Sequence, residues 1–255
     1  MVSRPLVLPD GEWAPAGSGE SDTEVFRRVD GTAYAKCAPA QGIEELRGER
    51  DRAIWLSGTG IPGAEVLDWI ETDDGACLIT SAVPGVAAVD LPPGKRERAV
   101  SRLSEAFRAL HELTDCPFSR PLSEVVEQAA DVVRRGAVNP EFLREESRHS
   151  SPEELLQRVR NEQPYAEKVA DLVVCHGDAC LPNVLLDPET LELTGLIDLG
   201  RLGWADRYTD LALTTVQLLD EWDLPPDGFL RAYGLEEPDQ RRLDFYLLLD
   251  PLTWG

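Results

Sequence analysis

The sequence lacks any long apolar run. Its first 19 residues mix Arg4, Pro5 and Asp10 with isolated apolar residues, so they contain no hydrophobic segment of the kind that a secretory signal needs. No later run approaches the roughly 20 apolar residues that a membrane-spanning helix requires. We therefore expect a cytoplasmic protein that makes no contact with a membrane.

Cysteine is scarce in this chain. There are five cysteines, an odd number, and they are widely scattered: Cys37, Cys77, Cys116, Cys175 and Cys180. Without an export signal such a set does not predict a disulfide framework, and we expect buried, reduced thiols. A zinc site at Cys175, His176 and Cys180 is not favoured, because no fourth ligand lies at a useful spacing.

Basic residues are few relative to acidic ones. The chain has 25 lysines and arginines against 47 aspartates and glutamates, which gives a formal net charge of -22. A surface of this sign repels the phosphates of nucleic acids and anionic lipids, so neither is an expected partner. Solubility explains most of these carboxylates, and the alternative is an acidic pocket for a polycationic small molecule.

The first part of the chain, residues 1–85, predicts a small α+β lobe. Asp30-Gly31 is a turn signal between two runs of strand character, which is typical of a β-hairpin. Apolar residues among charges, followed by Ser57-Gly58-Thr59-Gly60, predict one helix. Strands are expected at 25–29, 32–36, 65–69 and 76–81, the helix at 44–56, and a hinge near 80–85.

The second part, residues 86–255, predicts a mainly helical lobe. Apolar residues recur at helical spacing from Val100 to Leu113 and again from Leu122 to Val133. Ser151-Pro152-Glu153-Glu154 has the pattern of a capped helix start, and later buried helices are expected at 211–219 and 243–249. Short strands are expected at 172–175, 184–186 and 194–197.

These short strands flank the most informative motif. It is Val174-Cys175-His176-Gly177-Asp178-Ala179-Cys180-Leu181-Pro182-Asn183, followed by Leu196-Ile197-Asp198-Leu199-Gly200. An aspartate five residues before an asparagine, with a second aspartate one hairpin later, suits phosphoryl transfer. One carboxylate meets a substrate hydroxyl while the asparagine and the second aspartate hold Mg2+. A lone His-Gly-Asp more often only makes a turn.

Two upstream residues strengthen the kinase interpretation. Lys36 ends a predicted strand, where its ammonium can reach phosphate oxygens, and Glu49 on the next helix can pair with it. His176 is expected to brace the loop, and Asp210 to bind backbone amides of the loop. His111 and His149 have no recognisable partner in the sequence and are expected to be structural or surface residues.

The nucleotide contacts are less sharply defined by the pattern. Gly17-Ser18-Gly19-Glu20-Ser21-Asp22 precedes the first strand of the hairpin and offers backbone N–H groups and a hydroxyl to phosphates, but an ordinary turn explains it equally well. Tyr34 shares a strand face with Lys36, so its ring either lies against adenine or is part of the core. The segment 80–85 could offer backbone groups to the adenine edge.

With these residues in this order, the chain resembles the aminoglycoside phosphotransferases, whose fold is protein-kinase-like. The resemblance covers nearly the whole chain. Within that family it is most similar to the streptomycin 3''-kinase branch. The segments that carry the resemblance are Gly19-Glu20-Ser21, Val25-Phe26-Arg27-Arg28, Gly48-Glu49-Arg50-Asp51-Arg52, Ala137-Val138-Asn139-Pro140, 195–203 and Leu249-Asp250-Pro251-Leu252-Thr253-Trp254-Gly255. The last segment departs from the ending of the 3'-kinases, which is acidic and aromatic.

The resemblance implies a role for each matching residue. Asp178 would be the general base, Asn183 and Asp198 would bind Mg2+, and Lys36, with Glu49 as its partner, would hold the ATP phosphates. Ser21 would cap the phosphates, Tyr34 would stack on adenine, Ser81 and Val83 would give hinge contacts, and Arg201 would lie near the phosphates. The positions matching drug contacts are Glu145, Glu146, Asp220, Glu221 and Asp250.

We therefore expect a monomeric, ATP-dependent and Mg2+-dependent kinase of streptomycin, which carries two guanidinium groups and a methylamine. A carboxylate about 4 Å from such a charge gains roughly 4 kcal/mol of Coulomb energy at an effective dielectric near 20, before desolvation is subtracted. The alternatives are a 3'-kinase of kanamycin-type drugs or another small-molecule kinase of this fold. A catalytically dead binding module is disfavoured because Lys36, Asp178 and Asp198 are all present.

Overall fold

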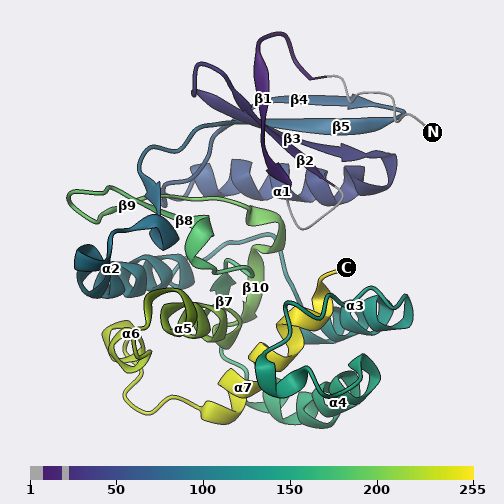
Figure 1. Ribbon diagram of the computed structural model, residues 1–255, viewed down its shortest axis with the longest axis vertical. Coiled ribbons are helices and arrows are strands. Elements are labelled where there is room, and N and C mark those ends of the chain that lie inside the picture. The colour runs from purple at the N-terminus through teal and green to yellow at the C-terminus, as the bar shows by residue number, and fades with distance from the viewer. Residues whose placement is uncertain (1–7, 19–22) are drawn as a thin grey trace.

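The computed structural model describes residues 8–18 and 23–255. Its N-terminal part is a five-stranded antiparallel sheet, with strand order β1-β2-β3-β5-β4 and one helix, α1, against it (Figure 1). The elements are β1 Trp13–Ser18, β2 Glu24–Arg28, β3 Ala33–Pro39, α1 Ile43–Ser57, β4 Val66–Thr72 and β5 Gly75–Ser81.

The expected hairpin between β2 and β3 is confirmed. At its turn the Asp30 carboxylate accepts hydrogen bonds from the backbone N–H and the hydroxyl of Thr32, at 3.0 and 2.7 Å. Gly31 has a φ of +76°, which a glycine adopts without steric cost. Local turn chemistry therefore sets the register of the hairpin, and Lys36 pairs with Val25 of β2.

Alternation along β3 divides its side chains between two faces. Ala35 and Cys37 belong to an apolar cluster on one face, whereas Ala38 packs with Leu46 of α1 on the other. Because successive side chains of a strand point to opposite faces, Tyr34 and Lys36 share the face that carries α1. The strand pattern therefore directs Lys36 toward the helix that holds Glu49.

The structure overturns the expectation that every thiol is reduced. Cys37 of β3 and Cys77 of β5 are directly opposed in the antiparallel register and form a disulfide. The two positions are 40 residues apart, and only the pairing of β3 with β5 brings them together. Cys116, Cys175 and Cys180 are free thiols, as expected.

The C-terminal part of the chain is mainly helical (Figure 1). Its helices are α2 Pro93–His111, α3 Leu122–Arg134, α4 Pro152–Val169, α5 Tyr208–Trp222, α6 Asp227–Tyr233 and α7 Gln240–Leu249. Two small antiparallel sheets are formed by β7 Leu172–Cys175 with β10 Gly203–Asp206, and by β6 Val86–Ala87 with β8 Val184–Leu186 and β9 Leu193–Leu196. Ser151 and Glu154 form the reciprocal capping box that the sequence predicts at the start of α4.

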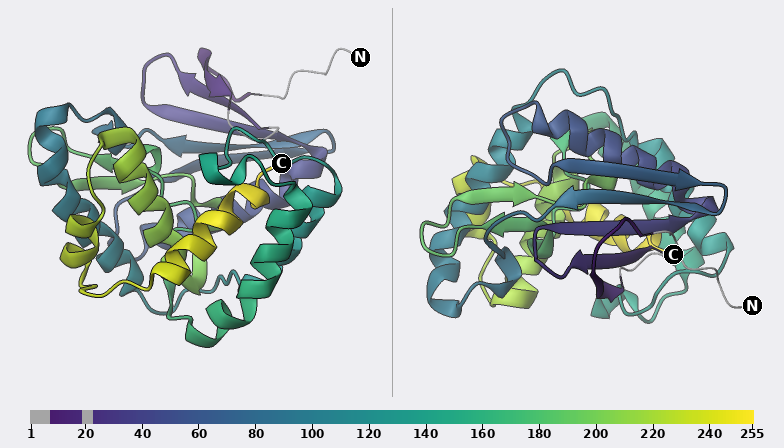
Figure 2. Two further views of the ribbon diagram at one scale, coloured as in Figure 1. Left: turned by 60° about the horizontal axis from the view of Figure 1, so that its bottom comes forward. Right: turned by 90° about the horizontal axis from the view of Figure 1, so that it is seen from above.

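Helix α1 connects the sheet to the rest of the molecule. Ala53 and Leu56 belong to the main apolar core together with residues of the C-terminal helices, and Arg52 Nε donates to the carbonyl of Leu202 at 2.7 Å. Seen from above, the N-terminal sheet lies over the helical part (Figure 2). The boundary between two lobes near residue 85 stays a prediction.

None of the helices in the described part of the chain is both long enough and apolar enough to cross a membrane.

We predict that loss of the Cys37–Cys77 disulfide destabilises the protein. Because the bond closes a loop of 40 residues in the unfolded chain, its reduction should lower the free energy of unfolding by about 2–4 kcal/mol. Urea unfolding with and without reductant measures the difference. The control is a Cys37→Ala/Cys77→Ala double variant, whose unfolding midpoint should not respond to reductant; an equal midpoint for the wild type in both conditions contradicts the prediction.

Candidate active site

The loop that follows β7 carries the predicted general base. It runs from His176 to Cys180 and continues into a short 3-10 helix, Leu181–Asn183, before β8. Gly177 has a φ of +82°, and a Cβ atom at this position would lie only 2.3 Å from the carbonyl oxygen of Arg201. We call residues 176–180 the catalytic loop. A glycine is required at position 177 for this loop to approach the loop that follows β9.

The carboxylate of Asp210 anchors this loop, as the sequence predicts. Asp210 is fully buried and accepts the backbone N–H groups of His176 and Gly177, at 2.7 and 2.8 Å. Burial alone would raise its pKa, but the hydrogen bonds and nearby histidines outweigh burial, so the pKa of Asp210 is lowered. The anchor is thus an anion matched to two backbone donors.

The imidazole of His176 braces the loop from the other side. Its Nε2 lies 3.0 Å from the carbonyl oxygen of Ile197, and the backbone N–H of Asp178 donates to its Nδ1 at 3.3 Å. The Nε2 therefore carries the proton and donates to Ile197. Because Ile197 precedes Asp198, this side chain connects the predicted base to the predicted metal ligand, which confirms its expected bracing role.

Asp178 and Asn183 are held together. The Asn183 amide nitrogen donates to the Asp178 carboxylate at 2.9 Å and to its carbonyl oxygen at 3.1 Å. Burial raises the pKa of Asp178, and the negative charges of Asp250 and Asp198 raise it further, although His176 and Arg201 oppose them. A carboxylate with a raised pKa is a better proton acceptor for a hydroxyl group than an ordinary one.

Lys36 joins the N-terminal sheet to the loop that contains Asp198. Its Nζ lies 2.8 Å from Oε2 of Glu49 on α1 and 3.0 Å from Oδ1 of Asp198. Burial alone would lower the pKa of Lys36, but attraction to Glu49 and Asp198 outweighs burial and raises it, so the ammonium stays charged. The pairing of Lys36 with Glu49, expected from the sequence, is confirmed in the structure.

The donor set fits a hard divalent cation. Asn183 uses its amide nitrogen toward Asp178, which leaves its Oδ1 without a hydrogen bond among the residues described. Asp198 contacts Lys36 through Oδ1 alone, and its side chain is 46% exposed. Two oxygen atoms of the kind that Mg2+ prefers are thus available beside Asp178.

The described residues predicted to contact adenine lie on β3, at the end of β5 and just beyond β5. Ser81 is held against Glu65, which donates its backbone N–H to the Ser81 hydroxyl at 2.9 Å. The side chain of Val83 packs closely over Gly195 of β9, where a Cβ atom would come within 2.6 Å. Tyr34 lies on the Lys36 face of β3, and Ser21 falls outside the described residues. Their nucleotide contacts stay predictions.

Arg201 lies against the C-terminal segment. Its guanidinium donates to the hydroxyl and the carbonyl oxygen of Thr253, at 3.0 and 3.3 Å, and lies 3.6 Å from Asp250. It also stacks on the ring of Trp254, with 3.4 Å between Cζ and the ring centroid. Its proposed proximity to phosphates stays a prediction, whereas its contact with the C-terminal segment was not foreseen.

The five acidic residues predicted for the acceptor lie on three different elements. Asp250 is near enough to Asp178 to raise its pKa. Glu145 and Glu146 are exposed on a short 3-10 helix, and Asp220 and Glu221 are exposed at the end of α5. Within the described residues, no hydrogen bond or ion pair joins these four carboxylates to Asp178, so their role in binding stays a prediction.

His111 is a buried structural residue, one of the two outcomes expected, but it has partners that the sequence did not reveal. Its imidazole is buried, with Nδ1 2.7 Å from the hydroxyl of Tyr233 and Nε2 3.0 Å from Oδ2 of Asp210. These residues are 122 and 99 positions away along the chain. No local pattern in the sequence could have identified this contact, because only the packing of α2, α5 and α6 creates it.

The strand lysine paired with a helix glutamate, the Asp178–Asn183 loop and Asp198 together define a protein-kinase-like phosphotransferase. Comparison with known proteins agrees, since residues 12–246 match the phosphotransferase enzyme family. The chain belongs to this family, and the resemblance and kinase-like fold expected from the sequence are confirmed.

Individual relatives are also similar over nearly the whole chain. Streptomycin 3''-kinase of Streptomyces griseus is 50% identical, with 96% of this chain and 93% of the relative covered. An aminoglycoside 3'-phosphotransferase of Streptomyces fradiae is 42% identical, with 95% of each covered. The structure of aminoglycoside phosphotransferase APH(3'')-Id from Streptomyces rimosus in complex with ADP and streptomycin superposes with a TM-score of 0.90, at 46% identity over 97% of this chain and 94% of that one.

We predict that Gly177→Ala impairs turnover. The added Cβ would be forced against the Arg201 carbonyl at a positive φ, so the loop must move, and a shift near 1 Å at a reacting group costs about 100-fold in rate. The measurement is kcat for ATP-dependent phosphorylation. Gly94→Ala on α2, whose Cβ would meet no atom within 4 Å, is the matched control; equal activity of both variants contradicts the prediction.

Proposed function

We propose that the protein transfers the γ-phosphoryl group of ATP to the 3''-hydroxyl of streptomycin and so confers resistance to this antibiotic. The observation that carries the proposal is the convergence of Lys36, Glu49, Asn183 and Asp198 around Asp178. The 50% identity with a streptomycin 3''-kinase supports the choice of acceptor.

The nucleotide would bind between the N-terminal sheet and the loop that contains Asp198. Lys36 would hold the α- and β-phosphates, Tyr34, Ser81 and Val83 would receive adenine, and Ser21 would cap the phosphates. In this scheme residues 1–85 form the nucleotide-binding lobe and residues 86–255 the acceptor lobe. Mg2+, held by Oδ1 of Asn183 and the carboxylate of Asp198, would supply neutralisation of phosphate charge.

Asp178 would accept the proton of the acceptor hydroxyl. The amide of Asn183 holds its carboxylate in one orientation, and His176 and Asp210 fix the backbone on which it stands. With the base held in this way, binding of the acceptor would have to place its hydroxyl in line with the γ-phosphorus.

A polycationic drug suits this acceptor lobe. Asp250 lies beside the base, and Glu145, Glu146, Asp220 and Glu221 are the further carboxylates proposed to receive guanidinium groups. We propose that the enzyme acts as a monomer in the cytoplasm, where streptomycin meets its ribosomal target.

A second candidate is phosphorylation of kanamycin- or neomycin-type drugs at a 3'-hydroxyl. It is favoured by the 42% identity with an aminoglycoside 3'-phosphotransferase. Against it stands the ending Asp250-Pro251-Leu252-Thr253-Trp254-Gly255, which differs from the acidic and aromatic ending of the 3'-kinases.

We predict that an acceptor panel separates the two candidates. Streptomycin should be turned over rapidly and kanamycin and neomycin poorly or not at all, and NMR of the product should place the phosphate on the 3''-oxygen. Rapid turnover of kanamycin with none of streptomycin would defeat the leading proposal and support the second.

We predict that Asp178→Ala abolishes most of the turnover while leaving ATP binding largely intact. Loss of a general base should lower kcat by about two to four orders of magnitude. Asp73→Ala removes the same charge from an exposed turn between β4 and β5 and should leave kcat unchanged. If Asp178→Ala retains wild-type kcat, Asp178 is not the base.

A further inference from the structure

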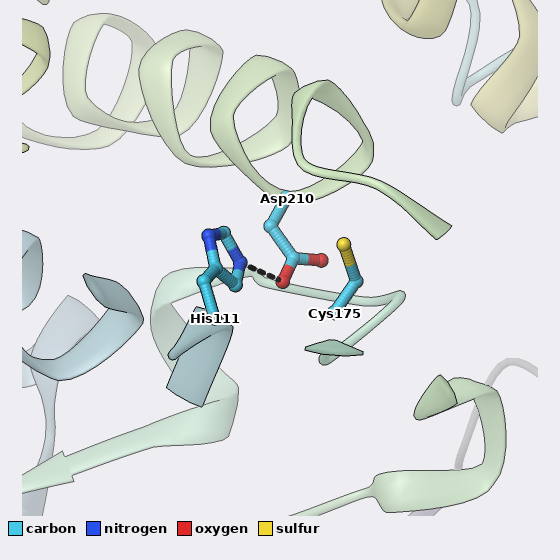
Figure 3. A group of neighbouring side chains, drawn as sticks. All are labelled: His111, Cys175 and Asp210. Atoms are coloured by element: carbon cyan, nitrogen blue, oxygen red, sulfur yellow. Dashed lines mark hydrogen bonds and ion pairs between the residues drawn. The ribbon is translucent and has the colours of Figure 1, made fainter. Parts of the chain in front are cut away.

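Beneath the catalytic loop lies a buried cluster of three chemically capable side chains, His111, Cys175 and Asp210 (Figure 3). Its composition suggests a metal site, but its hydrogen bonding does not. Burial raises the pKa of the Cys175 thiol well above its usual range, and its sulfur lies 3.4 Å from the carbonyl oxygen of Asp206 as a donor. The carboxylate of Asp210 is already engaged by three N–H groups.

The hydrogens shared by Tyr233, His111 and Asp210 have an assignment in which each contact has one donor and one acceptor. Arg207 can only donate, and its Nη1 lies 3.2 Å from the hydroxyl of Tyr233. The Tyr233 hydroxyl therefore accepts from Arg207 and donates its own proton to Nδ1 of His111. With Nδ1 as the acceptor, Nε2 of the imidazole carries the hydrogen and donates to Asp210.

This series of hydrogen bonds ends at the two carboxylate oxygens of Asp210, which also hold the catalytic loop. Oδ2 of Asp210 receives both His111 and the backbone N–H of His176, while Oδ1 receives the N–H of Gly177. The donation from His111 therefore holds the plane of the carboxylate so that each oxygen faces its own amide. A rotated carboxylate would misalign at least one of the two amides that directly precede Asp178.

We propose that His111 and Tyr233 are positioning residues for the catalytic base. Tyr233 fixes the tautomer of His111, His111 fixes the rotation of Asp210, and Asp210 sets the backbone that presents Asp178. The three residues come from the end of α2, the end of α6 and the first turn of α5, and the side chains of His111 and Asp210 are 2% and 0% exposed. The inference rests on the proposed role of Asp178 as the base.

The test compares His111→Leu, His111→Gln and Tyr233→Phe. Glutamine can donate from its amide nitrogen to Asp210 and accept from Tyr233 through its oxygen, whereas leucine can do neither. We expect kcat to fall about 10- to 100-fold in His111→Leu and about 3- to 10-fold in Tyr233→Phe, with KM for ATP and acceptor within roughly twofold of wild type. His111→Gln should recover most of the lost kcat.

The matched control is Tyr165→Phe. Like Tyr233, Tyr165 loses a single hydroxyl that makes a short side-chain hydrogen bond, here to Asp239 at 2.7 Å, but it lies on α4 away from the loop. Its kcat should equal that of the wild type. The proposal is overturned if His111→Leu and Tyr233→Phe keep wild-type kcat, if their KM rises while kcat is unchanged, or if His111→Gln loses as much as His111→Leu.

A readout without acceptor separates this inference from the proposed function. In His111→Leu and Tyr233→Phe the backbone amides of His176 and Gly177 should exchange with deuterium about 10-fold faster or more, while amides in β3 and β5 keep their rates. Unchanged exchange at His176 and Gly177 overturns the inference even if the enzyme is active. A wild type that phosphorylates no aminoglycoside would overturn the proposed function, and the exchange rates would still decide whether His111 and Tyr233 order the loop.

Discussion

A single buried anion, Asp210, is the constraint on which the active site depends. A carboxylate without access to water is stable only when its oxygens are hydrogen-bonded, and here the donors are two backbone amides and one imidazole. Because two of those donors belong to the residues directly before Asp178, satisfying the buried charge also fixes the catalytic loop. The side chain of His176 then extends the same order to Ile197, next to Asp198.

The second constraint is the charge balance around Lys36. Its ammonium is the positive partner of both Glu49 and Asp198, which come from α1 and from the loop after β9. These two carboxylates would repel each other without it, so Lys36 holds the N-terminal sheet, α1 and the loop that contains Asp198 in one arrangement. If bound ATP and Mg2+ replaced the contact between Lys36 and Asp198, the ion pair with Glu49 would still hold the lysine in place. The pair that sequence reasoning assigned to ATP binding therefore also stabilises the site before ATP arrives.

The elements that were predicted well depend on local chemistry. The turn at Asp30-Gly31 and the capping box at Ser151 are decided within a few residues, and the helical spacing after Val100 needs no knowledge of the fold. The Lys36–Glu49 and Asp178–Asn183 contacts were predicted because motif spacing places these residues together. The Cys37–Cys77 disulfide was missed because it depends on the register between β3 and β5, and the His111 contacts because they depend on how three helices pack.

Arg201 contacts both the C-terminal segment and the loop that carries Asp178. Its guanidinium is held by Thr253, Asp250 and Trp254 of the C-terminal segment. Its backbone carbonyl lies so close to Gly177 that no Cβ fits between them. A change in the C-terminal segment would therefore alter the contacts of the Arg201 side chain, and any shift of the Arg201 backbone toward Gly177 would press on the catalytic loop. For this reason we expect single acidic substitutions in this segment to disturb the surroundings of Asp178 as well as the proposed drug contacts, and we expect acceptor specificity to be exchanged better as a whole segment together with Arg201.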